Sequence, residues 1–293
     1  MAHRVSAAET RIARTFWTPQ RMRSAAPKAA VIPGAVPVAA RASTAGARHG
    51  RVARGTPTRV HAKPARGRAR NPFSSVIEDP TLDPYSTHGR IFGRYKGDQF
   101  SCSGTVINTP SNRAIMTAGH CLHERGVWSS HIVFVPAYQN GRRPFGNFYA
   151  KTLWVLDGWL NENFNFDVGM ISVRANSRGK PGNVVGARGW ATGVGRNQFF
   201  EAFGYPAGAN RGQQLRYCGS PYLGDDRSTY RDPGPPTMRI SCNMAGGSSG
   251  GGWVIDEEFT NSVVSYGYSA QRNRLYGPYF GLAVKRLINR VGG

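Results

Sequence analysis

The chain has 293 residues, of which 40% are hydrophobic and 11% are aromatic, so it can form one large or two small packed domains. No stretch of 18 apolar residues occurs, and we therefore predict no membrane span. The formal net charge is +22. The 37 glycines and 19 prolines, together with scarce helical periodicity, favour an all-β fold with many turns.

Positive charge is concentrated in the first quarter of the chain. Residues 1–75 contain 15 of the 38 Lys and Arg residues and one acid, Glu9, which gives them a net charge of +14. They are rich in Arg, Ala, Pro and Gly without periodicity, so we predict a disordered basic tail or pro-segment. Residues 15–19, with Phe16 and Trp17, are the one part that could dock on a folded body; a free tail is the preferred interpretation.

The composition of this tail also limits its partners. Its charge favours loose contact with anionic polymers. Binding to nucleic acid normally uses aromatic side chains interleaved with basic ones, and the tail has only Phe16, Trp17 and Phe73. We therefore predict no specific nucleic-acid partner.

From residue 90 the pattern changes to short apolar runs separated by turn residues, which is typical of β-strands. The first six predicted strands are 90–95, 103–106, 114–117, 131–135, 150–155 and 168–173. After a predicted link at residues 177–182, further strands are expected at 199–204, 213–218, 237–242, 253–256, 263–268 and 278–283. A short terminal helix is predicted from apolar residues at near-helical spacing: Leu282, Leu287, Ile288 and Val291.

Residues 242–253 stand out because five glycines surround the adjacent serines Ser248 and Ser249. Such a run can be a linker. However, it lies between Cys242 and the start of an apolar strand at Trp253, where a linker is unusual. The alternative is a tight loop that presents one serine Oγ and directs backbone N–H groups to the same point, as an acyl-transfer nucleophile and its oxyanion hole require.

A serine nucleophile needs a base and an acid that orients it. His120 follows an apolar strand that ends in small residues, and Asp167 stands at the start of another apolar strand. The chain order is therefore His120, Asp167, Ser249. An α/β-hydrolase places its His after the Ser, and no His follows His131. A subtilisin places its Asp before the His, and the long amphipathic helices of that fold are missing here.

The order His, Asp, Ser is that of the chymotrypsin-like proteases. Residues 117–121 (TAGHC), 167–171 (DVGMI), 247–251 (GSSGG) and 265–267 (SYG) resemble the TAAHC, DIALL, GDSGG and SWG segments of trypsin/chymotrypsin-like serine peptidases. Residues 204–206 (GYP) resemble a segment of the bacterial branch related to glutamyl-endopeptidase-like enzymes. The resemblance covers roughly residues 85–291.

This resemblance implies an all-β, chymotrypsin-like fold of two six-stranded antiparallel β-barrels with a short C-terminal helix. Residues 85–182 would form the N-terminal barrel with His120 and Asp167, and residues 183–293 the C-terminal barrel with Ser249. Ser249 would attack the scissile carbonyl, His120 would take its proton, and Asp167 would hold the imidazole. The backbone N–H groups of Gly247 and Ser249 would form the oxyanion hole.

Other side chains compete for these roles. Asp157 is a second possible acid, but it belongs to a turn dipeptide with Gly158, so Asp167 is preferred. Ser248 could be the nucleophile only after a register slip. His123 and His131 are expected to be surface or strand residues.

The chain departs from the family pattern at two points. The Asp that precedes the nucleophile in trypsin-like enzymes is Ser248 here, and it cannot form an ion pair with a freed N-terminus. The predicted specificity pocket carries no charge, which favours a polar uncharged or small apolar substrate side chain. Its residues are Asn243, Val264, Ser265, Tyr266 and Gly267.

Four cysteines allow three disulfide pairings, and the residues alone do not choose among them. The resemblance implies that Cys102 pairs with Cys121, and the second bridge would then join Cys218 to Cys242. A zinc site is the competing interpretation, but no CxxC pair is present, so we expect no metal and no other cofactor. Disulfides indicate a secreted or extracytoplasmic protein, although residues 1–23 show no apolar signal core.

The predicted function is that of a monomeric serine endopeptidase, a hydrolase that cleaves protein or peptide substrates through an acyl-enzyme intermediate. The first alternative is a catalytically silent, protease-like protein that binds peptides or envelope polymers through its basic tail. A nucleic-acid-binding protein is the second alternative, and it is based on charge alone.

Overall fold

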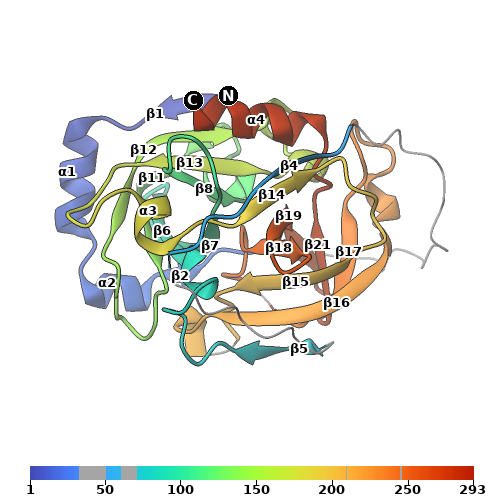
Figure 1. Cartoon of the computed structure of the whole chain (residues 1–293), viewed down its shortest axis with the longest axis horizontal. Helices are drawn as coiled ribbons and strands as arrows, with labels where there is room; N and C mark the ends of the chain where they lie inside the picture. Colours follow the sequence, from blue (N-terminus) through green and yellow to red (C-terminus); the bar gives the residue numbers. More distant parts are fainter. Residues whose placement is uncertain (33–50, 61–70, 209, 245) are drawn as a thin grey trace.

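The computed structural model describes residues 1–32, 51–60, 71–208, 210–244 and 246–293. Two large β-sheets lie side by side and a helix closes the chain (Figure 1). Both termini lie on the same side of the molecule, where Met1 and the last helix line one small cavity. Among the helices of these ranges, none is both long and apolar enough to cross a lipid bilayer.

The first sheet is a closed antiparallel barrel. Its strands pair in the order β12, β11, β6, β7, β8 and β13, and β13 pairs back with β12. They are β6 (His88–Tyr95), β7 (Asp98–Val106), β8 (Ala114–Thr117), β11 (Ser130–Pro136), β12 (Phe148–Val155) and β13 (Gly169–Val173). All six predicted strands of this half are therefore confirmed. Alternate apolar residues fill the interior, including Ile91, Ile115, Phe134 and Ile171, each with no exposed surface.

The second sheet surrounds its own core, in which Phe200 and Trp253 pack edge to face. Its strands pair in the order β20, β21, β17, β16, β15, β18, β19 and β14. They are β14 (Gly189–Thr192), β15 (Phe199–Gly204), β16 (Arg216–Asp225), β17 (Met238–Ser241), β18 (Gly252–Ile255), β19 (Phe259–Val263), β20 (Tyr266–Tyr268) and β21 (Arg274–Gly277). The predicted all-β class and the six-stranded antiparallel barrel of the first half are thus confirmed, whereas the second sheet has more than the six predicted strands and its β14–β19 pairing is parallel.

Two strand predictions in this half need correction, and one strand was missed. The strand expected at residues 263–268 is divided into β19 and β20, because Val264 leaves the sheet to exchange backbone hydrogen bonds with Gly250 and Gly251. The strand expected at 278–283 lies earlier, as β21, since Pro278 offers no N–H for pairing. Strand β14 was not predicted.

The predicted terminal helix is confirmed as α4 (Leu282–Gly292). Val284, Leu287, Ile288 and Val291 face inward and pack against the first barrel. Short elements connect the strands: η1 (Tyr85–Thr87), η2 (Gly119–Cys121), β9 (His123–Glu124), β10 (Val127–Trp128), η3 (Asp157–Asn161), η4 (Phe164–Phe166), α3 (Pro181–Val185), η5 (Asn210–Gly212) and η6 (Arg227–Thr229).

The N-terminal part is folded wherever the structure describes it, so of the two predicted alternatives the disordered tail is wrong for residues 1–32, 51–60 and 71–75, whereas the pro-segment stays a prediction. It contains β1 (Ala2–Arg4), α1 (Ala7–Phe16), α2 (Pro19–Ser24), β2 (Ala26–Pro27), β3 (Ala30–Ile32), β4 (Ala53–Gly55) and β5 (Asn71–Val76). Each of these five strands pairs with a strand of the body. The rest of the predicted tail, residues 33–50 and 61–70, lies outside the described residues.

Local signals explain why this basic segment folds. The Ser6 hydroxyl caps α1 by accepting from Glu9 N–H, and Thr18 caps α2 in the same way. Trp17, which is 3% exposed, packs on Phe92 and donates to the His131 carbonyl at 2.6 Å. Docking through the aromatic pair at residues 15–19, which was not the preferred interpretation, is therefore what the structure shows.

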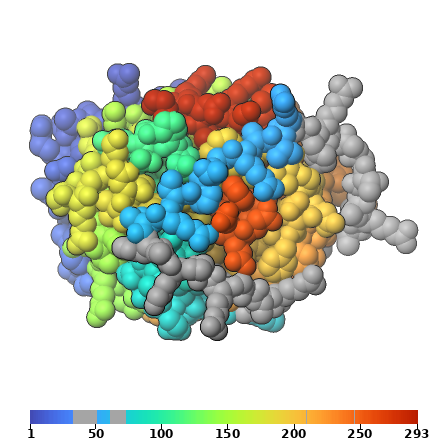
Figure 2. Space-filling view, viewed as in Figure 1, coloured from blue at the N-terminus to red at the C-terminus, as the bar shows by residue number. Residues whose placement is uncertain are grey.

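Residues 51–60 run across the junction between the two halves, as the light-blue atoms in Figure 2 show. β4 pairs with β14 of the second half, and Thr56 accepts a hydrogen bond from Asn108 of the first. The N-terminal part therefore contacts both halves.

Candidate active site

The glycine-rich loop connects β17 to β18 and places Ser249 at the junction of the halves. Gly247 and Gly250 have φ values of +90° and +82°, which favour glycine. A Cβ at Gly250 would lie 2.5 Å from the Ser103 carbonyl oxygen, so the loop also needs glycine for space. Ser103 N–H donates to the Ser249 carbonyl at 2.7 Å and links the loop to the first barrel.

His120 is held against Asp167 by two contacts. Its Nδ1 lies 2.8 Å from Asp167 Oδ2, and its backbone N–H donates to Oδ1 at 2.8 Å. The Ser265 hydroxyl also donates to Oδ2. Because an ionised carboxylate only accepts hydrogen bonds, a neutral His120 carries its proton on Nδ1 and leaves a lone pair on Nε2.

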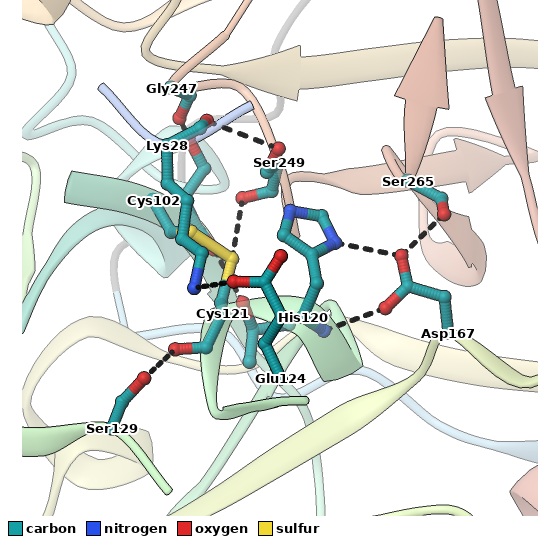
Figure 3. Close-up of a disulfide and its surroundings, with 12 residues drawn as sticks. Lys28, Cys102, His120, Cys121, Glu124, Ser129, Asp167, Gly247, Ser249 and Ser265 are labelled. Atoms are coloured by element: carbon teal, nitrogen blue, oxygen red, sulfur yellow. Dashed lines mark hydrogen bonds and ion pairs between the residues drawn. A yellow bond between two sulfur atoms is a disulfide. The ribbon is translucent and has the colours of Figure 1, made fainter. Parts of the chain in front are cut away.

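In Figure 3 the imidazole lies between Asp167 and Ser249. His120 and Asp167 are 2% and 0% exposed. In the parts of the chain that the structure describes, His120 Nε2 is buried without a hydrogen-bond partner. The arrangement thus offers an oriented base with a free acceptor next to a serine hydroxyl.

The competing side chains have other surroundings, except that Ser248 lines the same cavity as Ser249. Asp157 is exposed and forms an ion pair with the Met1 amine at 2.5 Å. His123 lies in β9, as predicted for a strand residue, where it is buried against Trp128, and this burial lowers the pKa of its imidazole. His131 lies in β11, as predicted for a strand residue, and Ser248 is buried.

The Gly247 N–H, a predicted oxyanion donor, has a partner from the N-terminal segment. It donates to the Lys28 carbonyl oxygen at 2.7 Å. The Ser249 hydroxyl donates to the same oxygen at 3.4 Å (Figure 3). Sequence reasoning missed Lys28, since a lone Lys among Ala and Pro carries no motif.

A cavity of about 380 Å³ opens beside Ser249, and all five predicted pocket residues line it. Arg272 and Arg274 line it as well. The prediction missed these two arginines because they belong to the turn and strand after β20, where no family segment was identified. Asn243 Oδ1 accepts from Ser74 N–H at 2.7 Å, so the N-terminal part reaches this pocket too.

A buried carboxylate supports the pocket wall. Asp226, which is 1% exposed, accepts hydrogen bonds at Oδ2 from Tyr266 at 2.5 Å and from Tyr268 at 2.7 Å. Burial, and secondarily this carboxylate, raise the pKa of the Tyr266 hydroxyl, so the phenol stays protonated and donates. Sequence reasoning also missed Asp226, which lies in the polar loop between β16 and β17.

Both implied disulfides are confirmed. Cys102–Cys121 joins β7 to the turn that carries His120, and Cys218–Cys242 joins β16 to the chain just before the glycine-rich loop. The sulfur atoms of Cys102 and Cys121 lie within 4.8 Å of a His120 ring nitrogen. Because the disulfide removes both thiolates, this group is not suited to bind zinc.

Comparison with known proteins matches the chain to one protein family and to a named protease. The profile of the family described as Trypsin matches residues 81–288. A glutamyl endopeptidase of Bacillus licheniformis is 26% identical over 199 residues, which is 58% of this chain and 61% of the relative's length.

Two solved structures share 32% identity with the chain. Protease Anisep from Arthrobacter nicotinovorans superposes with a TM-score of 0.68 over 75% of this chain and 99% of its own. The thermostable serine protease AL20, from an extremophilic microorganism, superposes with a TM-score of 0.65 over 71% of this chain and 97% of its own.

Proposed function

Because the chain belongs to the Trypsin family, we propose that it is a serine endopeptidase that cleaves protein or peptide chains through an acyl-enzyme intermediate on Ser249. The observation that carries the proposal is the buried His120–Asp167 pair next to the Ser249 loop. The names of the related proteases support the same reaction class.

Each side chain has one role in this reaction. Ser249 Oγ attacks the scissile carbonyl, and His120 Nε2 accepts its proton and then donates it to the leaving amine. Asp167 holds the Nδ1–H tautomer and stabilises the imidazolium. The N–H groups of Gly247 and Ser249 bind the oxyanion; in another protease the loss of one such donor costs about 3–4 kcal/mol of transition-state stabilisation.

The cavity beside Ser249 limits the substrate side chain. No carboxylate belongs to its described lining, whereas Arg272 and Arg274 do. We therefore propose that the enzyme cleaves after neutral or acidic side chains; the Bacillus relative is named for glutamyl bonds. A peptide-library cleavage profile tests this, and fastest cleavage after Lys or Arg would contradict it.

The proposed enzyme acts outside the cytoplasm. Its two disulfides are consistent with an oxidising compartment. Loose contact of the basic N-terminal part with anionic polymers, action as a monomer and action without a metal remain part of the proposal.

A fluorophosphonate probe tests the reaction. We expect the chain, after limited proteolysis of its N-terminal part, to be labelled covalently at one serine. The label should disappear in Ser249→Ala and persist in the matched neighbour variant Ser248→Ala. A processed protein that stays unlabelled would instead favour the silent, protease-like binding protein.

A further inference from the structure

Residues 26–32, the cleft segment, lie across the candidate active site. β2 pairs in parallel with β7, and β3 pairs in parallel with β20. β7 carries Cys102, whose disulfide reaches the turn of His120, while β20 carries the pocket residues Tyr266 and Gly267. The cleft segment therefore spans both halves of the molecule and passes in front of Ser249.

The backbone of Lys28 occupies the position expected for a substrate carbonyl. Its oxygen accepts from Gly247 N–H at 2.7 Å and from the Ser249 hydroxyl at 3.4 Å, and its own N–H donates to Ser101 at 2.8 Å. Ala29 follows directly, and a Cβ placed on Gly246 would lie 2.7 Å from the Ala29 side chain. While Lys28 is in place, the Gly247 N–H is therefore already paired and does not offer its hydrogen bond to a second peptide.

The direction of the cleft segment is unfavourable for cleavage. If the Lys28–Ala29 bond were cut, the Ala29 nitrogen would be the leaving group and would need a proton from His120. The residues after Lys28 instead run along β20 and line the cavity. The Lys28 side chain lies on the other side, next to the turn that follows His120. Relative to a substrate bound for cleavage, the residues on the acyl side and on the leaving-group side of the Lys28–Ala29 bond therefore occupy each other's positions.

The Lys28 side chain is anchored by a site built for a cation. Its Nζ lies 3.0 Å from Glu124 Oε2, 4.3 Å from the Tyr95 ring centroid and 4.9 Å from the Phe100 ring centroid. The side chain is 12% exposed. Burial lowers the pKa of this ammonium and Glu124 opposes the shift, so the carboxylate is what keeps a desolvated charge in place.

We propose that residues 26–32 inhibit the enzyme from within the same chain by binding its cleft in the non-productive direction, and that Glu124, Tyr95 and Phe100 form the cation site that holds them there through Lys28. The ligand class of this cation site is an extended peptide with a Lys or Arg side chain. The inference rests on the proposed function, since inhibition presupposes a reactive Ser249.

Charge exchange in the full-length protein tests the anchor. The rate of fluorophosphonate labelling is measured for the wild type, Lys28→Glu, Glu124→Lys and the double variant. We expect each single variant to react at least about tenfold faster than the wild type. In each of them two like charges face each other in a partly buried site, which weakens the binding of the cleft segment. The double variant should return close to the wild-type rate, which a folding defect would not produce.

Lys151→Glu makes the same charge change on an exposed position of β12 and should keep the wild-type rate. Single variants that react no faster than the wild type would overturn the inhibitory role. A double variant as fast as the single variants would overturn the cation site.

A synthetic peptide of residues 24–32 tests the direction of binding. Added to the Lys28→Glu protein, it should slow labelling and remain intact by mass spectrometry, whereas the same peptide carrying Lys28→Glu should have no effect. Cleavage between Lys28 and Ala29 would overturn the non-productive direction.

The two proposals fail in different ways. Equally fast labelling of the wild type and Lys28→Glu would leave the endopeptidase standing and remove the inhibition. Absence of labelling even after proteolysis of the N-terminal part would remove the endopeptidase itself.

Discussion

At the scale of single residues, Asp167 shows how one buried carboxylate can organise a site. Three donors converge on it: the His120 backbone, the His120 ring and the Ser265 hydroxyl. An Asn in its place would turn an N–H₂ group toward donors and allow the other imidazole tautomer. We expect Asp167→Asn to lower kcat about 10⁴-fold, as the same change does in a related triad.

The matched control is Asp157→Asn, which changes the same group at an exposed position 10 residues earlier. The kcat of each variant is measured by steady-state hydrolysis of a peptide after limited proteolysis of the N-terminal part. Comparable losses of kcat in the two variants would show that Asp167 is not the orienting acid.

At the scale of elements, the two N-terminal helices hold the cleft segment next to the body. The contact depends on Trp17, whose indole is buried against β6 and hydrogen-bonded to β11. Truncating a buried Trp costs about 3–5 kcal/mol in other proteins. We therefore expect Trp17→Ala to release α1 and α2 and to accelerate proteolysis of the N-terminal part.

Ile12→Ala in α1, the helix that ends just before Trp17, is the control, since Ile12 is 55% exposed. Time-resolved limited proteolysis followed by mass spectrometry distinguishes the variants. Equal cleavage rates in the two would mean that docking does not depend on the indole.

At the scale of the whole molecule, each half provides part of the site and a disulfide supports each part. The bridges close loops of 19 and 24 residues by sequence separation. Each is worth about 3 kcal/mol in the chain-entropy model. Reduction of both should lower the Tm by more than about 10 °C, since about 1 kcal/mol corresponds to about 2–4 °C in a domain of this size.

Calorimetry with and without reductant measures this, and Cys218→Ser/Cys242→Ser isolates the contribution of the first bridge. On reduction, this double variant should show about half of the decrease in Tm that the wild type shows. A Tm that moves by less than about 3 °C on full reduction would show that packing alone sustains the fold.

Much of the body was predictable because its signals are local. Short apolar runs between turn residues marked all six strands of the first barrel, and periodic apolar residues marked α4. Residues 263–268 could not be divided correctly, since the break at Val264 depends on hydrogen bonds to the glycine-rich loop. Capping signals at Ser6 and Thr18 were present in the N-terminal part, but its basic composition concealed them.

The sequence by itself determined the six strands of the first barrel and the terminal helix, and it singled out His120, Asp167 and Ser249 as candidate site residues, because motif residues and periodicity depend on near neighbours. Only the tertiary structure decided that the Lys28 carbonyl lies at Ser249 and that the Lys28 ammonium pairs with Glu124. It also decided that Arg272 and Arg274 line the pocket and that Asp226 supports its wall. These contacts join residues far apart in the chain, and their free energy arises from burial and charge pairing that exist only once the chain is folded.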